Sequence, residues 1–279
     1  MGKIAVVIVL YYSKGYDCGL QLDNSAISII MVDNTPNREL TLTGRSIYYI
    51  PLKENKGIAT AQNVGICKAQ ELGCTYVLFF DQDSVVKANY IEHIVSEYIR
   101  LKKVYPNLAI LGPTVVNKET GKKYKSVHKS QNQNCIILPS LISSGSIIEM
   151  DVIDDVGMME EDLFIDSVDF EWCWRAKSKG YVCVMSLTIE LPHKVGQKEY
   201  SFCGFPVILS APVRYYYQYR NFLWLLRRGY VPLKWKIKVS IRKLIEMILL
   251  PFYSKNGMTI LRYIFQGIKD GIFSKNSTK

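Results

Sequence analysis

The sequence has no apolar stretch long enough to cross a membrane. One uncharged run, residues 200–213, spans 14 residues and contains Pro206 and Pro212, whereas a membrane-spanning helix needs about 20 mostly apolar residues. The apolar run Ile4–Leu10 follows a single lysine and lacks a small-residue cleavage site, which indicates a buried strand rather than a signal peptide. The sequence therefore predicts no transmembrane helix.

A cysteine pattern typical of a zinc site or a disulfide framework is also missing. The seven cysteines are odd in number, have no Cys-x-x-Cys spacing and lie mostly within apolar segments. Buried free thiols in a reducing cytoplasm explain this set better than disulfides or zinc. Low-complexity tracts are absent too, and 48% of the residues are hydrophobic, which excludes a disordered chain.

Negative charge is scarce in the last part of the chain. Residues 194–279 contain 16 Lys and Arg against three acids, a net charge of +13, so the total of +10 leaves residues 1–193 at −3. A basic tail with interleaved apolar residues predicts contact with an anionic surface, either a membrane or a nucleic acid.

Apolar runs and helical patterns alternate over the first 112 residues. The predicted strands are Ile4–Leu10, Ile27–Val32, Ile47–Ile50, Tyr76–Phe80 and Leu108–Leu111, and the predicted helices are Gly57–Leu72 and Lys87–Lys103. This alternation predicts an α/β fold with a mostly parallel central sheet flanked by helices. We expect Gly112-Pro113 to end this half of the chain and residues 117–134 to form a surface hairpin or loop.

Two carboxylates follow the most apolar of these strands. Asp81 and Asp83 come directly after Tyr76–Phe80, at the carboxyl end of a strand, where open α/β sheets bind ligands. Oxygen ligands of this kind suit a hard divalent cation. The alternative is that the pair caps the helix that begins near Lys87.

Polar residues also follow the second strand and open the first helix. Asp33-Asn34 can accept hydrogen bonds from a base or ribose, or can simply form a turn with Thr35-Pro36. Asn55-Lys56-Gly57 gives the following helix a glycine-led start, which allows close approach to a phosphate or base. It is not a P-loop, because the Gly-Lys-Ser/Thr ending is absent.

The second half contains a denser set of candidate site residues. Ser143–Ser146 is glycine-containing and lets the backbone pass close to a ligand, or forms an ordinary turn. In the acidic and aromatic segment 160–175, Asp169 is a candidate general base, because partial desolvation beside Phe170 and Trp172 raises a carboxyl pKa. The alternative, an acidic helix start stabilised by the helix dipole, accounts for residues 160–162 but poorly for Asp169. His193 is either a structural histidine or, with two acids, a ligand of an octahedral Mg or Mn site.

Taken in order, these motifs resemble the inverting family 2 glycosyltransferases of the GT-A fold, especially their bacterial rhamnosyltransferase-like branch. The matching segments are residues 32–35 (VDNT), 55–65 (NKGIATAQNVG), 80–84 (FDQDS), 144–146 (SGS) and 163–172 (LFIDSVDFEW), together with His193 and Gly196. The resemblance covers about residues 4–230.

The resemblance implies a role for each matching residue. The implied donor-nucleotide contacts are Tyr11, Asp33, Asn34, Asn55, Gly57, Asn63, Asp81 and Gln82. The implied sugar and acceptor contacts are Ser144, Gly145 and Trp172, and the implied ligands of a Mg or Mn ion are Asp83, Asp81 and His193. Asp169 is implied as the catalytic base. Many relatives have a Glu-Asp pair there, whereas Val168 precedes Asp169 here, so Asp166 and Glu171 stay as alternatives.

The implied function is transfer of a sugar, with inversion, to a hydroxyl of a lipid-linked oligosaccharide in cell-surface polysaccharide synthesis. The branch resemblance favours dTDP-rhamnose as donor, and a UDP-sugar is the alternative. The alternative from a different class is a basic nucleic-acid-binding protein without catalytic activity, which would bind phosphates and bases with the basic tail. This alternative leaves the acidic front half unexplained.

The expected organisation is a catalytic domain over residues 1–210, with a nucleotide-binding half at 1–112 and an acceptor-binding half at 113–210, followed by a basic, aromatic helical region at 211–279. Within this region, Arg214–Arg228 and Lys234–Phe252 predict amphipathic helices lying on the inner face of the bacterial cell membrane. The alternative for the first helix is packing on the catalytic domain. Association of identical chains stays open.

Overall fold

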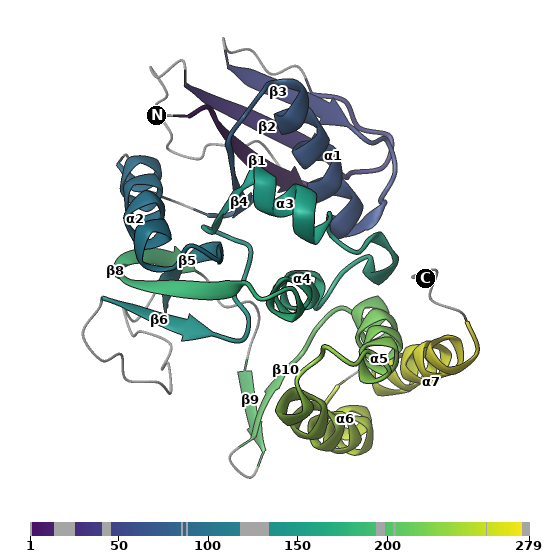
Figure 1. Cartoon of the computed structure of the whole chain (residues 1–279). Coiled ribbons are helices and arrows are strands. Elements are labelled where there is room, and N and C mark those ends of the chain that lie inside the picture. The colour runs from purple at the N-terminus through teal and green to yellow at the C-terminus, as the bar shows by residue number, and fades with distance from the viewer. Residues whose placement is uncertain are drawn as a thin grey trace.

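A computed structural model describes residues 2–13, 26–40, 46–84, 86–87, 89–117, 134–193, 199–202, 205–254 and 256–274 of the chain. At its centre is an eight-stranded sheet in the order β3-β2-β1-β4-β7-β5-β8-β6 (Figure 1). The strands are β1 (Ile4–Leu10), β2 (Ile27–Asp33), β3 (Ile47–Pro51), β4 (Tyr76–Asp81), β5 (Leu108–Asn117), β6 (Cys135–Leu138), β7 (Ile147–Glu149) and β8 (Val182–His193). The first four strands are parallel, β7 runs antiparallel between β4 and β5, and β8 is parallel to β5.

Helices cover both faces of this sheet. They are α1 (Gly57–Glu71), α2 (Tyr90–Val104), α3 (Met150–Val156) and α4 (Val168–Ser178). Alternate residues of β1 point to opposite sides, since Ala5 and Val7 pack in one core cluster with α1, α3 and α4, while Val6 and Ile8 pack in another with α2. The predicted mostly parallel α/β sheet flanked by helices is thus confirmed, and the strand and helix ranges predicted for residues 4–108 agree within a few residues.

The predicted strand end before Gly112-Pro113 is wrong, whereas the division between the two halves at residue 112 stays a prediction. β5 continues through both residues to Asn117 and pairs with β8 along its length, with a shift of register between Gly112 and Thr114. A proline cannot donate to the ladder, so an irregularity of this kind is where a strand accommodates it. Of the predicted loop at 117–134, residues 118–133 lie outside the described part of the chain.

Three further helices form the C-terminal region: α5 (Pro212–Leu226), α6 (Leu233–Tyr253) and α7 (Gly257–Phe273). They lie side by side at the lower right of Figure 1. A short antiparallel hairpin, β9 (Glu199–Phe202) and β10 (Phe205–Ile208), precedes them. None of the helices in the described part of the chain combines the length and the apolar character that a bilayer crossing requires.

α5 joins the main body of the protein rather than standing apart. Trp224 belongs to the core cluster of the sheet, and Leu225 packs with Trp174 of α4. The sequence alternative in which Arg214–Leu226 packs on the catalytic domain is therefore confirmed. The predicted separation at residue 210 stays a prediction.

The cysteines fit the expected free thiols. Cys74, Cys135, Cys173 and Cys183 are buried and Cys67 is exposed, all of them free. Cys18 and Cys203 lie outside the described residues.

Candidate active site

A pocket of about 470 Å³ opens where the carboxyl end of β4 faces the start of α4. Asp81 and Ser144 line it on the side of the sheet, which we call the sheet wall. Residues 165–170, including Asp169, line it from the opposite side together with Arg214 of α5, and we call this side the helix wall. The pocket therefore brings together Asp81, Ser144 and Asp169, three of the residues singled out from sequence.

The sheet wall is fixed by hydrogen bonds between β4 and the Ser-Gly-Ser segment. Ser144 Oγ accepts from Asp81 N at 3.2 Å and lies 3.0 Å from Ser84 Oγ. Gly145 N donates to Phe79 O at 2.7 Å, with Gly145 at φ +77°. That conformation strains any residue with a side chain, so glycine is required here for the segment to follow β4.

These bonds determine where the two acids of the Asp-x-Asp pair emerge. Asp81 is half-buried at the pocket and Asp83 is exposed in the turn that follows. Gln82, between them, accepts from Tyr11 N at 2.7 Å through its Oε1, and this bond ties the ends of β4 and β1 together. The Tyr11 side chain is 43% exposed. Its predicted contact with the nucleotide stays a prediction.

Asp169 stands in the first turn of α4 with its carboxylate toward the pocket. Phe170 N donates to its Oδ1 at 2.9 Å. Burial raises the pKa of Asp169 to about 6; the nearby charge of Asp81 also raises it, and the backbone amides of Phe170 and Ser143 lower it. A carboxyl with this pKa is mostly ionised at neutral pH yet is a better proton acceptor than an exposed aspartate.

The two alternative bases are held by cations. Arg214 forms a two-pronged ion pair with Asp166. Glu171 is fully buried and bonded to Arg175 Nε at 3.0 Å, Arg228 Nη1 at 3.2 Å and the Tyr230 hydroxyl at 2.7 Å. Within the described residues no cation pairs with Asp169. The geometry therefore favours Asp169 as the base and gives Glu171 a structural role.

The loop that leads into α4 has an unusual backbone. Phe164, Asp166 and Ser167 all have positive φ, at 62°, 65° and 67°. For residues other than glycine this conformation costs free energy and persists only where the surroundings enforce it. Strain of this kind is concentrated at functional sites, and here it lies directly before Asp169.

α5 supplies the contacts that enforce this loop. Asn221 Nδ2 donates to Leu163 O and Ile165 O, each at 2.8 Å. Arg220 also donates to Leu163 O, and the Tyr217 ring stacks on Phe164 with centroids 4.5 Å apart. The position of the base thus depends on a helix some 50 residues further along the chain. Sequence reasoning missed Asn221 and assigned the arginines of this helix to a surface, because no local pattern identifies their partners.

Gly57 lies against this same loop. Ile58 N donates to Phe164 O at 2.7 Å, so a carbonyl of the protein caps the start of α1. Gly57 has φ +85°, and a Cβ there would lie 2.6 Å from Phe164 O. Glycine is therefore needed here for the close approach of the loop, and the predicted nucleotide contact of Gly57 stays a prediction.

Asn63 likewise has a structural role. It is buried, its Nδ2 donates to Met159 O at 3.0 Å and to Glu161 Oε1 at 2.9 Å, and its Oδ1 accepts from Met159 N at 2.9 Å. With its amide group satisfied by the protein, Asn63 ties α1 to the segment before the strained loop. Its predicted contact with the nucleotide stays a prediction.

Asp33 is also engaged with the protein. It is fully buried; its carboxylate accepts from Thr35 N at 3.0 Å and the Tyr49 hydroxyl at 2.8 Å, and Arg38 Nε lies 3.3 Å away. Burial and the bond to Asp33 raise the pKa of Tyr49 to about 12. The turn chemistry weighed as an alternative from sequence is thus present. A contact between Asp33 and the base stays a prediction.

Asn34 and Asn55 connect the end of β2 to the start of α1. Asn34 Nδ2 donates to Asn55 Oδ1 at 2.9 Å, and Asn34 Oδ1 accepts from Lys56 N at 2.8 Å. Asn55 Oδ1 also accepts from Gly57 N at 3.1 Å. The two asparagines shape this corner of the molecule, and their contact with a nucleotide stays a prediction.

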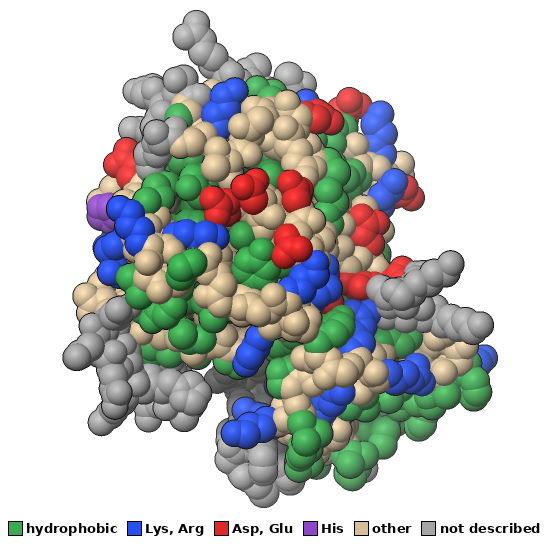
Figure 2. All heavy atoms as spheres, viewed as in Figure 1, with side chains coloured by type: hydrophobic (Ala, Val, Ile, Leu, Met, Phe, Trp, Pro, Cys, Tyr) green, Lys and Arg blue, Asp and Glu red, His purple; other side chains and the backbone are tan. Residues whose placement is uncertain are grey.

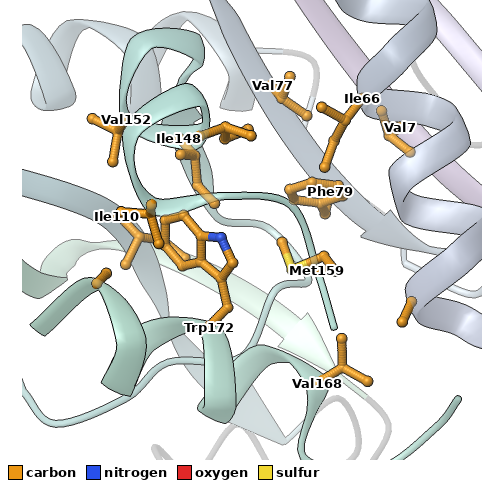
Figure 3. Close-up of a cluster of buried hydrophobic side chains, with 14 of the residues drawn as sticks. Val7, Ile66, Val77, Phe79, Ile110, Ile148, Val152, Met159, Val168 and Trp172 are labelled. Carbon is orange, nitrogen blue, oxygen red and sulfur yellow. The ribbon is translucent and has the colours of Figure 1, made fainter. Parts of the chain in front are cut away.

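Trp172 is a core residue and not an acceptor contact. Its side chain is 1% exposed and lies near Ile110 and Ile148 in the main core cluster (Figure 3). Its indole Nε1 donates to Gly157 O at 2.8 Å. The residues of α4 that line the pocket are Val168, Asp169 and Phe170, whereas Trp172 points into the core, so its predicted contact with the acceptor is corrected.

For a metal ion, Asp81 and Asp83 provide hard carboxylate oxygens of the type that Mg and Mn prefer. The described residues contain no group of three or more His, Cys, Asp or Glu arranged to hold a metal. His193 ends β8 opposite Asn117, and its side chain lies outside the described part. The carboxylate pair suits a divalent cation, and the set of three ligands stays a prediction.

A mostly parallel sheet with two acids at the end of a central strand, the first of which lines a pocket together with a half-buried carboxylate, is the arrangement predicted for a GT-A type of sugar-transfer site. The comparisons with known proteins agree. The model of Glycosyl transferase family 2 matches residues 20–157. The dTDP-rhamnosyl transferase RfbF of Shigella flexneri is 32% identical over 258 residues, covering 88% of this chain and 86% of that protein. The chain belongs to glycosyl transferase family 2 and is a glycosyltransferase that uses a nucleotide sugar.

Solved structures support the fold. The crystal structure of GalNAc-T7 with UDP, GalNAc and Mn²⁺ aligns with 98% of this chain at a TM-score of 0.58 and 12% identity; the match spans 56% of the GalNAc-T7 chain. The structure of S. aureus TarS 1–349 with UDP-GlcNAc aligns with 91% of this chain and 72% of that chain, at a TM-score of 0.51 and 13% identity. At these identities the likeness shows the GT-A fold alone.

Proposed function

We propose that the protein transfers rhamnose from dTDP-rhamnose, with inversion, to a hydroxyl group of a lipid-linked saccharide, in the synthesis of a cell-surface polysaccharide. The donor rests on the 32% identity to a dTDP-rhamnosyl transferase over most of both chains. The chemistry rests on one observation above all: Asp169, which no described cation neutralises, faces Asp81 across a single pocket.

Asp169 acts as the general base. Its carboxylate takes the proton from the attacking hydroxyl, while the Phe170 and Ser143 amides hold it in place. Attack on the anomeric carbon from the face opposite the leaving nucleotide inverts the configuration in one displacement, as in base-assisted inverting glycosidases with water replaced by a sugar hydroxyl. The Asp166–Arg214 pair closes the helix wall and keeps a second carboxylate from competing for the proton.

Asp81 and Asp83 are the residues that would hold a Mg or Mn ion. When bound there, such an ion supplies Lewis-acid neutralisation of the charge that develops on the leaving diphosphate. The Ser144 hydroxyl, bonded to Asp81 N, fixes the strand end that carries both acids. The likeness in fold to a Mn²⁺ complex supports this assignment.

The test is a turnover assay with dTDP-rhamnose and, in parallel, UDP-sugars, each with and without Mn. We expect release of dTDP to exceed release of UDP. A thermal-shift series with dTDP and UDP provides a measurement that does not need the acceptor, because a ligand that binds the native state raises its melting temperature. Preference for UDP and a UDP-sugar in both assays would replace the donor by a UDP-sugar, the alternative named from sequence, and leave the reaction type unchanged.

A further inference from the structure

The surface of α6 and α7 is apolar where a surface normally is not. Fifteen large hydrophobic residues are exposed in the described part of the chain, and nine of them belong to these two helices. The nine are Leu233, Ile237, Ile241, Leu244, Ile248, Met258, Phe265, Ile272 and Phe273. Scattered exposed apolar residues need no explanation, but a concentration of this kind marks an interaction site. We call this set the α6–α7 face.

On α6 the exposed residues form a continuous stripe. Leu233, Ile237, Ile241, Leu244 and Ile248 are separated by three or four positions and therefore lie on one side of the helix. A different side of α6 packs inward, where Met247 and Leu250 join Tyr215 and Tyr219 of α5. The helix is thus apolar on two sides, and the described part of the chain covers one of them.

α7 repeats this arrangement. Met258, Phe265 and Ile272 recur every seven residues on its exposed side, while Ile260 and Ile264 pack inward. The inward side is tightly fitted, since a Cβ on Gly267 would lie 2.4 Å from Tyr216 O. α7 is therefore fixed on α5 and holds its exposed aromatic residues in a defined position.

The charges around these stripes are positive. Residues 233–273 contain eight Lys and Arg against Glu246 and Asp270. Both acids are occupied, because Glu246 bonds to Arg242 and Lys243, and Asp270 accepts from the Tyr216 hydroxyl at 2.9 Å. Exposed Arg262 and Lys269 stand one helical turn from Phe265, on the side it occupies. Figure 2 shows the apolar and basic side chains adjoining at the lower right of the molecule.

We propose that the α6–α7 face docks onto the surface of an anionic phospholipid bilayer. Helices that interleave long aliphatic and aromatic residues with Lys and Arg suit the boundary between headgroups and acyl chains, and anionic lipids attract such basic segments. A single-stranded nucleic acid would instead require a basic groove with stacking aromatic rings, whereas the α6 stripe is entirely aliphatic. The membrane contact is thus made by α6 and α7. It does not include α5, whose aromatic residues pack against the protein.

This inference rests on the proposed function, because a lipid-linked acceptor gives the docking its purpose. α5 connects the two sites: Arg214 lines the pocket, and the following Tyr215 packs with α6 and α7. A protein held by the α6–α7 face therefore works on saccharides that are attached to the same surface.

The experiment is flotation of the full chain with vesicles of phosphatidylcholine alone or mixed with phosphatidylglycerol. The test variant is Ile241→Glu/Leu244→Glu, which places charge in the middle of the stripe. The matched control is Ile99→Glu, an exposed position on α2, far from this face (Figure 1). We expect wild type and control to float with the anionic vesicles and to be released by salt, and the double variant to lose at least tenfold in bound fraction.

Equal flotation of the double variant and the wild type would overturn the proposal. So would salt-sensitive binding to a single-stranded oligonucleotide without vesicle binding, or a dimer in solution that the double variant dissociates while no form binds vesicles. The thermal shift with dTDP, measured on the same samples, reports on the pocket separately. Loss of nucleotide binding in the wild type with vesicle binding intact would count against the proposed function and not against the α6–α7 face.

Discussion

The two walls of the pocket are built by different means. On the sheet wall, Asp81 takes its place from the ladder of β4 and from Ser144, which is bonded to the end of the same strand. On the helix wall, Asp169 follows a loop with three positive φ angles that is enforced by side chains of α5. The acids of the sheet wall are therefore placed by regular secondary structure, and the base is placed by tertiary contacts. Substitutions away from the pocket should affect the base more than the acid pair.

The largest effect is expected from Asp169→Asn. Removing a general base typically costs about 10²–10⁴ in rate, so transfer should fall to the lower end of what the assay detects. Circular dichroism should show an unchanged fold. The control is Asp151→Asn, an exposed acid on α3, which should keep the wild-type rate. Near-normal turnover of Asp169→Asn would show that Asp169 is not the base and would make Asp166 the candidate. The difference in how the two walls place their acids would then have no bearing on the base.

Asp169→Asn should also be the more stable protein. Because the folded pKa of Asp169 is raised from 3.8 to about 6, the native state binds more protons than the unfolded chain between these values. The free energy of unfolding therefore falls as pH rises through this window. The total fall is about 1–3 kcal/mol, which corresponds to a pKa shift of about one to two units. Thermal melts at pH 4 and pH 7 measure this difference, and the variant should not show it. A lower melting temperature of the variant at pH 7 would contradict the raised pKa.

The corresponding change on the sheet wall is Asp83→Ala. Losing a metal ligand should reduce transfer by about 10²–10³, in line with several kcal/mol of transition-state stabilisation. Because Asp83 is exposed, the stability should stay within about 0.5 kcal/mol of wild type. The transfer rate measured at increasing Mn concentration shows whether the lower activity results from weaker metal binding. An unchanged Mn response in Asp83→Ala would remove Asp83 from the metal site.

An intermediate effect is expected from Asn221→Ala, which lies outside the pocket. It leaves the carbonyls of Leu163 and Ile165 without the Asn221 donor, at a cost of about 1–3 kcal/mol in stability. The turnover number should fall by roughly ten- to a hundredfold, since a displaced catalytic group loses alignment with its target, while KM for the donor stays nearly constant. Tyr216→Phe on the same helix, which loses a bond to Asp270, is the matched control and should turn over normally.

The smallest effect concerns the pH dependence of the rate. With the Asp169 pKa at about 6, the base is ionised above this pH and protonated below it. The rate should be level near pH 7–8 and should fall tenfold per unit well below pH 6. If Asn221→Ala opens the helix wall to water, the midpoint should move toward the ordinary aspartate value. A midpoint that stays at 6 in Asn221→Ala would show that α5 does not set the environment of the base.

The sequence predicted the sheet wall better than the helix wall, and the reason is physical. The strand before Asp81 and Asp83 is a local pattern of five apolar residues, and such patterns determine secondary structure directly. The contacts of Asn63 with Met159, and of Gly57 with the loop at Phe164, join residues about a hundred positions apart. Neither residue carries a local sign of its partner, so both were assigned to the nucleotide.

The basic tail shows the same limit. Composition predicted one amphipathic region, yet α5 is buried against the protein while α6 and α7 expose apolar stripes. All three helices mix apolar residues with Lys or Arg, and this mixture does not show which helix packs on the protein. The sequence indicates Asp169 because it lies beside Phe170 and Trp172, whereas the ion pairs of its neighbours Asp166 and Glu171 are contacts that the sequence does not reveal.

The hydrogen bonds from Asn221 to the loop at Leu163–Ile165 have a consequence for the order of synthesis. A growing chain exposes the whole sheet, Asp81, Asp83 and Asp169 before α5 has left the ribosome. Until then the loop before α4 lacks the donors that hold it, and the base has no fixed place. Sugar transfer should therefore begin only once α5 has emerged and packed on this loop, so that a product terminated before α5 stays inactive.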